Sequence, residues 1–135
     1  MKSVITGWSK AHQDGGAWVR HHQLRHDIFI DRLHYDVQSS NSMEFDQFDT
    51  PNAVYIVVMD EADDKALACC RIVPTSAPTM VGTLWPELLG EFDLSRTGHV
   101  GTTHIGVRHE LPSNVRQAAL NCLIQTTLEF TSRGG

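Results

Sequence analysis

The most continuous apolar run in the chain lies at residues 54–59, Val-Tyr-Ile-Val-Val-Met, and predicts a buried strand. The acidic residues that follow predict a turn, after which a second apolar segment returns as the partner strand of a hairpin. Apolar positions at helical spacing predict helices towards both ends of the chain. In chain order, the predicted elements are a helix over 17–33, strands over 54–59 and 66–73, a short helix over 80–89, a strand over 100–107 and a helix over 114–130.

Two segments outside these elements are polar. Residues 1–15 are polar and contain glycine, which predicts a loose arm, and residues 36–52 are expected to form a long loop. Loops longer than about 12 to 15 residues are uncommon unless they are functional or disordered. The segment 36–52 is therefore a place where functional side chains are expected.

The last predicted helix carries apolar residues on two sides. Leu120, Ile124 and Leu128 form a second stripe beside the main one, so we expect this helix to be covered on both sides, with Asn114 as its N-cap. A helix, antiparallel strands and a second helix together predict a single domain over residues 1–135, an α/β layer of the α+β kind.

Composition narrows the class of protein. The chain has 135 residues, 41% hydrophobic and 20% charged, as in an ordinary soluble domain. Its net charge of −5 argues against a nucleic-acid partner, which needs a basic face. With no run of about 18 apolar residues and no signal-like N-terminus, we expect a cytoplasmic protein without a membrane partner. Cys69, Cys70 and Cys122 are predicted to be reduced core thiols.

Three carboxylates gather in the predicted loop. Asp46 and Asp49 are three residues apart, and Glu44 is close by. Paired carboxylates can hold an ammonium or sulfonium centre by Coulomb attraction and charge-assisted hydrogen bonds. A solvated acidic loop is the alternative interpretation of the same spacing.

Arg71 stands within the apolar strand predicted over 66–73. A buried guanidinium needs a partner, and its planar fork matches a carboxylate. The partner is either the carboxylate of a bound ligand or an acidic residue of the chain, in an internal salt bridge. A ligand that is cationic at one end and carries a carboxylate would suit Arg71 and the acidic pair together.

The first predicted helix presents a mixed face. Arg25, Phe29 and Arg32 share one side of it, and Tyr35 follows at its end. An aromatic ring beside a sulfonium gains about 0.5 to 2 kcal/mol from cation–π attraction. Plain core packing is the alternative for Phe29.

A metal site is not predicted. His22 and His26 have the i, i+4 spacing of a zinc helix, but Gln23 stands where a zinc protease places its glutamate, and no acidic third ligand stands out. The adjacent Cys69 and Cys70 would point to opposite faces of a strand, which does not suit shared ligation. We expect neither a metal nor a separate cofactor.

Three motifs in this order resemble those of the acyl-homoserine-lactone (autoinducer) synthases of bacterial quorum sensing. Family members carry Arg-x-x-Val-Phe-x-x-Arg-Leu-Gly-Trp, then Glu-x-Asp-x-Tyr-Asp, then Arg-Leu-Leu-Pro-Thr. The corresponding segments here are Arg25-x-x-Ile28-Phe29-x-x-Arg32-Leu33-His34-Tyr35, Glu44-x-Asp46-x-Phe48-Asp49 and Arg71-Ile72-Val73-Pro74-Thr75.

The resemblance implies a GNAT-like fold with a mostly antiparallel central sheet flanked by helices. It also implies a reaction: the amine of S-adenosylmethionine attacks an acyl thioester delivered on acyl carrier protein or as acyl-CoA, and lactonisation then releases methylthioadenosine. Adenosylmethionine is thus a substrate, not a cofactor. The substrate-binding residues implied by the family positions are Arg25, Phe29, Tyr35, Asp46, Asp49, Arg71 and Thr103.

The chain departs from the family pattern in the strand predicted over 100–107. At family spacing, Gly101 takes the place of a glutamate that assists amine deprotonation, and His104 takes the place of an arginine. His104 is then the candidate general base, because imidazole titrates near neutral pH. Together with Arg71 it is predicted to be catalytic.

The second departure is length, because the family usually runs some 60 residues further. The acyl cleft is expected to be incomplete at the C-terminus, or completed by a second copy of the chain in a homodimer. Two alternatives to a synthase follow: a truncated or non-catalytic homologue that only binds adenosylmethionine or a partner, and a GNAT-type enzyme that acylates another amine.

Overall fold

A computed structural model describes residues 1–10, 16–32, 38–40, 43–62, 65–74 and 100–132. The helix predicted over 80–89 lies outside these residues, and so does Tyr35. For residues 100–104, which include Thr103 and His104, the structure describes the backbone but not the side chains.

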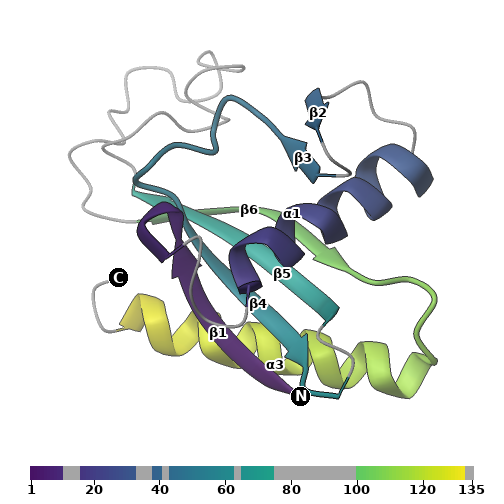
Figure 1. Cartoon of the computed structure of the whole chain (residues 1–135). Helices are drawn as coiled ribbons and strands as arrows, with labels where there is room; N and C mark the ends of the chain where they lie inside the picture. The colour runs from purple at the N-terminus through teal and green to yellow at the C-terminus, as the bar shows by residue number, and fades with distance from the viewer. Residues whose placement is uncertain (11–15, 33–37, 41–42, 63–64, 75–99, 133–135) are drawn as a thin grey trace, which may run out of the picture.

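A four-stranded antiparallel sheet with the order β1-β4-β5-β6 forms the centre of the molecule (Figure 1). Its strands are β1 Lys2–Gly7, β4 Val54–Asp60, β5 Lys65–Pro74 and β6 Val100–Val107. The three predicted strands are confirmed. The predicted loose arm is wrong for its first ten residues, because β1 pairs along the whole of β4 and the 3-10 turn η1 (Trp8–Lys10) follows it.

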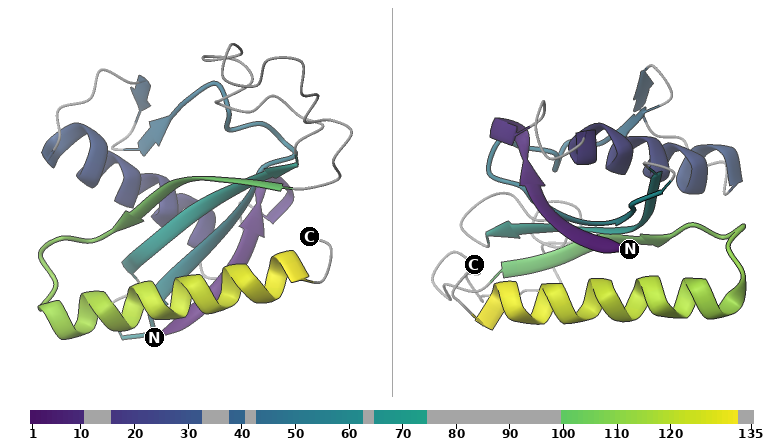
Figure 2. Two further views of the ribbon diagram at one scale, coloured as in Figure 1. Left: turned by 180° about the vertical axis from the view of Figure 1, so that it is seen from behind. Right: turned by 60° about the horizontal axis from the view of Figure 1, so that its bottom comes forward.

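Two helices cover opposite faces of this sheet (Figure 2). The predicted first helix is present as α1 (Ala17–Arg25), which continues as the wider π-helical segment η3 (His26–Arg32). The last predicted helix is α3 (Ser113–Ser132). The predicted cap, Asn114, is wrong by two positions, because α3 begins at Ser113 and its first bond runs from the N–H of Arg116 to the carbonyl of Pro112.

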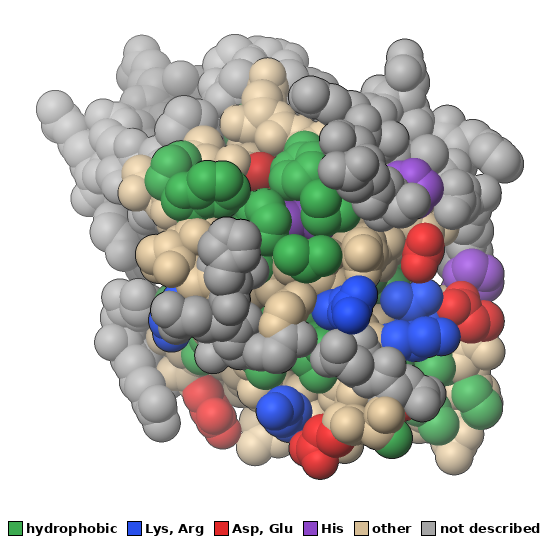
Figure 3. All heavy atoms as spheres, viewed as in Figure 1, with side chains coloured by type: hydrophobic (Ala, Val, Ile, Leu, Met, Phe, Trp, Pro, Cys, Tyr) green, Lys and Arg blue, Asp and Glu red, His purple; other side chains and the backbone are tan. Residues whose placement is uncertain are grey.

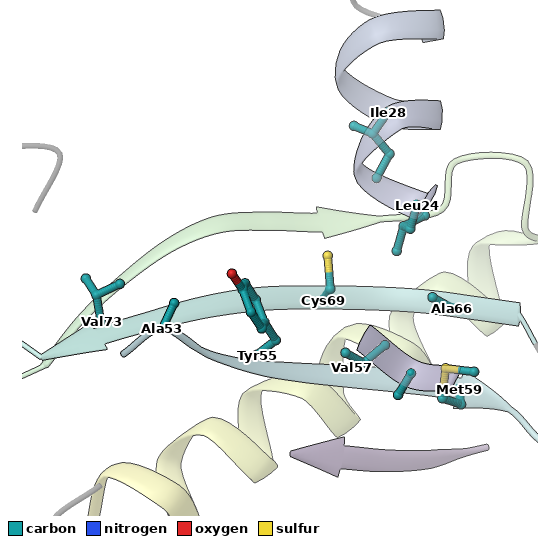
Figure 4. Packing of buried hydrophobic residues seen from close by; sticks show 10 residues of the cluster. Leu24, Ile28, Ala53, Tyr55, Val57, Met59, Ala66, Cys69 and Val73 are labelled. Carbon is teal, nitrogen blue, oxygen red and sulfur yellow. The ribbon is translucent and has the colours of Figure 1, made fainter. Parts of the chain in front are cut away.

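Strand β4 is buried on both faces, which explains its unbroken apolar sequence. Tyr55 and Val57 pack in the core under α1, whereas Ile56 and Val58 pack in the core under α3. Figure 4 shows the first core, in which Leu24 and Ile28 lie over the strands. The three cysteines are free, and the adjacent Cys69 and Cys70 belong to the two opposite cores, as predicted.

Two further predictions need correction. The loop predicted over 36–52 contains a small two-stranded sheet of β2 (Gln38–Ser40) and β3 (Met43–Phe45). The second apolar stripe of α3 is not covered, because Ile124 is 48% and Leu128 is 63% exposed.

A close approach between β6 and η3 makes Gly106 sensitive to substitution. A Cβ at Gly106 would lie 2.9 Å from Cδ1 of Ile28, which is buried in the core. We therefore expect Gly106→Ala to destabilise the fold by about 1 kcal/mol, since overpacking displaces core atoms. Urea denaturation measures the change. Ile28→Val removes the opposing methyl group, so Gly106→Ala should not lower the free energy of unfolding in that variant. An equal loss with and without Ile28→Val would show that the contact with Ile28 is not its cause.

Candidate functional site

A cluster of buried charged side chains lies between α1, β3 and the start of β4, on the face of the sheet that α1 covers. Arg25 is at its centre, and its Nη1 and Nη2 donate to Oδ1 and Oδ2 of Asp49 at 2.7 and 2.8 Å. Its Nη2 also lies 2.5 Å from Oε2 of Glu44, and both of these side chains are fully buried. This bidentate geometry is the strong form of an arginine–carboxylate pair.

Arg71 joins the same cluster from β5. Its Nη1 donates to Oδ1 of Asp46 at 2.5 Å and to Oδ1 of Asp49 at 3.2 Å. Its guanidinium carbon lies 5.7 Å from the centre of the Phe48 ring, within cation–π range. The structure thus shows the internal salt bridge that was one of the two interpretations of Arg71.

The local fold of residues 46–49 explains why the two aspartates act together. Asp46 accepts a hydrogen bond from the N–H of Phe48 at 2.8 Å, and Asp49 Oδ2 accepts one from the N–H of Asp46 at 2.8 Å. The N–H of Asp49 in turn donates to the carbonyl of Asp46 at 3.2 Å. These bonds close a turn that aims both carboxylates at the arginines. A solvated acidic loop is therefore the wrong interpretation.

Tyr55 fixes the carboxylate of Asp49 from the strand side. The Tyr55 hydroxyl donates to Oδ1 of Asp49 at 2.7 Å, and burial together with the charge of Asp49 raises the pKa of Tyr55 above its usual value. Burial alone would raise the pKa of Asp49, but hydrogen bonds and charge from Arg25 outweigh it and hold that pKa well below its usual range. Asp49 is therefore ionised throughout the neutral range.

Among the described residues of the cluster, acidic groups outnumber basic ones. The three carboxylates of Glu44, Asp46 and Asp49 face the two guanidinium groups of Arg25 and Arg71. Asp46 is the most accessible of the three acids, with 16% of its side chain exposed against 6% for Asp49 and 0% for Glu44. A cationic ligand would therefore meet the cluster through Asp46.

Two buried histidines lie beside the cluster, and both are neutral. The Nδ1 atoms of His21 and His22 lie 3.2 and 2.8 Å from the carbonyl oxygens of Trp18 and Glu44. A carbonyl only accepts, so each Nδ1 carries the hydrogen. Burial first, and then nearby positive charge that includes Arg25, lowers the pKa of His22 to about 4, and the pKa of His21 is also well below its usual value.

The structure brings together four of the predicted substrate-binding residues: Arg25, Asp46, Asp49 and Arg71. Phe29 is partly buried and packs against the core under α1, as its alternative interpretation held. The backbone of Thr103 pairs with that of Arg71, but the side chains of Thr103 and His104 lie outside the description, as does all of Tyr35.

Sequence reasoning missed the part played by Tyr55 and the inward direction of the histidines. Tyr55 belongs to the apolar run of β4, and the only available signal was a hydroxyl in a run of otherwise apolar side chains.

Within the described residues, no three His, Cys, Asp or Glu side chains meet as a metal site. None of the described helices is both long and apolar enough to cross a membrane.

Comparison with known proteins gives this cluster a family context. The family model for autoinducer synthases matches residues 16–132. The acyl-homoserine-lactone synthase of Aliivibrio fischeri is 40% identical over 68 residues, which are 50% of this chain and 35% of that protein. The enzyme of the same name from Acinetobacter nosocomialis is 27% identical over 92 residues, 68% of this chain and 49% of that protein. The matches span about a third to a half of the length of these relatives.

Solved structures agree on the fold. TofI, in a ternary complex with an inhibitor and MTA, superimposes with a TM-score of 0.75 at 20% identity, over 100% of this chain and 68% of TofI. BjaI, a CoA-dependent acyl-homoserine lactone synthase with SAM and isopentyl-CoA, gives 0.73 at 23% identity, over 93% of this chain and 58% of BjaI. The predicted GNAT-like fold is confirmed. Since the family model covers most of its residues, the chain belongs to the autoinducer synthase family.

Proposed function

We propose that the chain is an acyl-homoserine-lactone synthase that uses S-adenosylmethionine as the amine and an acyl thioester, on acyl carrier protein or coenzyme A, as the acyl donor. The observation that carries this proposal is the buried cluster of Arg25, Asp46, Asp49 and Arg71. Its members occupy the family motif positions, and the carboxylates of Asp46 and Asp49 suit the cationic groups of adenosylmethionine.

The proposed reaction has two steps. The adenosylmethionine amine attacks the thioester carbonyl, the C–S bond of the thioester breaks, and the amine proton passes to a base while the thiol leaves. The methionine carboxylate oxygen then attacks the carbon next to the sulfonium, the C–S⁺ bond breaks, and methylthioadenosine leaves with the electron pair. Holding amine and thioester together supplies much of the acceleration.

The residues of the cluster have different parts in this proposal. Asp46 attracts the cationic substrate. Arg71 and Arg25 are both fully buried, and their guanidinium groups hold the carboxylates of the cluster in position. His104 remains the predicted general base and Thr103 a predicted pocket residue; both belong to β6, in which the backbone of Thr103 pairs with that of Arg71. A base at His104 predicts a rate that falls as pH drops through the imidazole pKa.

Release of methylthioadenosine tests the function. The protein is incubated with adenosylmethionine and acyl thioesters of several chain lengths, on acyl carrier protein and on coenzyme A, and both products are followed by mass spectrometry. Formation of lactone and methylthioadenosine in equal amounts supports a synthase. Binding of adenosylmethionine without either product would instead indicate the binding-only homologue. Acylation of a different amine would indicate the third alternative.

Asp46→Asn is expected to weaken adenosylmethionine binding by about 10- to 100-fold, because a hydrogen bond to a charged group is worth about 1.5–3 kcal/mol. The asparagine oxygen still accepts from the N–H of Phe48, so the turn is kept. Calorimetry measures the affinity. The matched control is Asp60→Asn, whose carboxylate caps the turn N–H of Ala62 at 2.9 Å outside the cluster. Unchanged affinity in Asp46→Asn would remove Asp46 from the binding site.

A further inference from the structure

A pocket of about 220 Å³ opens between η1, the first turns of α1, β3 and the segment that leads into β4. On the face shown in Figure 3, hydrophobic side chains gather in the upper part of the molecule around a small acidic patch. The side chains that line the pocket are Trp8, Trp18, Phe45, Asp49, Thr50, Pro51 and Tyr55. An apolar cavity of about 150 Å³ already admits benzene, so this pocket has room for a small organic group.

Most of the described residues that line the pocket are aromatic. Trp8 and Trp18 meet edge to face with centroids 5.4 Å apart, and Trp18 and Phe45 are 6.2 Å apart at 49°. Trp8 is 61% exposed and stands at the rim. A large ring left this open at the rim of a pocket is a common feature of binding surfaces.

The charge around the pocket favours a cation. Asp49 is the one charged side chain among the described lining residues, and the described part of the cluster behind it holds three carboxylates and two guanidinium groups. Both oxygens of Asp49 are already bonded to Arg25 and Tyr55, so the carboxylate acts through its charge. His22 packs behind Trp18 and Phe45 at 4.5 and 4.3 Å, and its neutral ring adds no positive charge.

A second polar feature points to an occupant. The hydroxyl oxygen of Thr50 is buried in the lining and has no hydrogen-bond partner among the described residues. Buried polar groups normally have a partner. Because this oxygen has almost no exposed surface, the Thr50 side chain would have to rotate to bond a ligand hydroxyl in the pocket.

The pocket is distinct from the site proposed for adenosylmethionine. The two share only Asp49, and none of Trp8, Trp18 and Phe45 belongs to the residues assigned to that substrate. Trp18 and Phe29 lie on one helical rod 11 residues apart, which corresponds to about 16 Å along its axis.

We propose that this aromatic pocket is an additional binding site for a small organic cation with a methylated ammonium head group. Three rings surround the head group, the charge of Asp49 attracts it, and Thr50 bonds a hydroxyl on its tail once the Thr50 side chain rotates. Aromatic cages recognise such cations through the ring faces. The inference does not depend on the proposed acyl transfer, because no reacting group takes part in it.

Choline and its neutral isostere 3,3-dimethylbutan-1-ol test the proposal, since they share shape and hydroxyl and differ in charge. Binding to the intact chain is followed by NMR of the indole N–H groups. We expect choline to shift the signals of Trp8 and Trp18 with an affinity of about 1 mM, and the isostere to bind at least about fivefold more weakly. Equal binding of the two, or no binding of choline at that concentration, would overturn the proposal.

Two variants and a competition locate the site. Trp8→Ala should weaken choline binding about fivefold, and because Trp8 is exposed the fold should persist. Leu128→Ala, at a 63% exposed position on the opposite face, should leave it unchanged. Choline should still bind when adenosylmethionine is present, somewhat more weakly, because both cations draw on the charge of Asp49. Complete competition between the two would show a single shared site and overturn an additional one, whereas absence of adenosylmethionine binding would bear only on the proposed enzyme function.

Discussion

Arg25→Met is expected to destabilise the fold by about 3–5 kcal/mol, the cost of breaking a buried ion pair by removing one partner. Arg25 has no exposed surface, and it holds the fully buried Glu44 and the nearly buried Asp49. Burial alone would lower the pKa of Arg25, yet hydrogen bonds and charge from Asp49 raise it above its usual value. Without the guanidinium, these carboxylates remain in a dry environment with fewer compensating charges.

Urea denaturation at neutral pH measures this loss, and two comparisons interpret it. Arg108→Met removes an arginine whose carboxylate partners, Asp27 and Glu110, are 44% and 54% exposed, and it also removes the bond to the carbonyl of Ala66 at 3.0 Å, so it should cost about 1–2 kcal/mol. Adding Asp49→Asn to Arg25→Met should restore part of the lost stability, because the buried charge that lost its main partner disappears. An Arg25→Met cost as small as that of Arg108→Met would mean that water reaches the cluster.

Local sequence patterns were sufficient for the main elements. The run at 54–59 is apolar at every position because both faces of β4 are buried, and no partner needs to be known to recognise that. The spacing of Asp46 and Asp49 also predicted a paired site, since a short turn places both carboxylates on one side.

Non-local pairing explains what local patterns did not predict. Strand β1, Lys-Ser-Val-Ile-Thr-Gly, is short and polar enough to resemble an arm, and it is a strand because β4 offers an unpaired edge along its whole length. Strands β2 and β3 have three residues each, and each is a strand because it pairs with the other. Propensity alone does not specify such pairings.

The detailed chemistry of the site was hidden for a similar reason. Arg71 was recognised as buried, but only the folded chain shows that Asp46 and Asp49 satisfy its charge internally. Tyr55 looked like a core residue, and its bond to Asp49 depends on how the turn packs on β4. A polar atom in an apolar run signals that a partner exists, and the fold decides which one.

The buried histidines predict that acid weakens the fold well above the range in which carboxylates titrate. In the unfolded chain His22 protonates at its ordinary pKa of about 6.5, whereas in the fold it stays neutral down to about 4. Between these values the unfolded state binds more protons, so stability is complete above pH 6.5 and falls as pH decreases. A difference of roughly 2.5 pH units corresponds to about 3 kcal/mol for His22, and His21 acts in the same direction.

Urea denaturation between pH 7 and pH 4 tests this, with variants that separate the histidines. His22→Gln keeps an N–H donor near the carbonyl of Glu44 but cannot titrate. Between pH 7 and pH 4 its free energy of unfolding should therefore fall by about 3 kcal/mol less than that of the unsubstituted chain. His109→Gln, at an exposed turn position, should follow the unsubstituted chain. Asp49 does not contribute in this window, because its pKa is depressed and its effect begins only below the ordinary carboxylate range. If His22→Gln lost as much stability as the unsubstituted chain, the ring of His22 would have to be protonated in the fold, and the Nδ1–H tautomer assigned from its bond to Glu44 would no longer account for its burial.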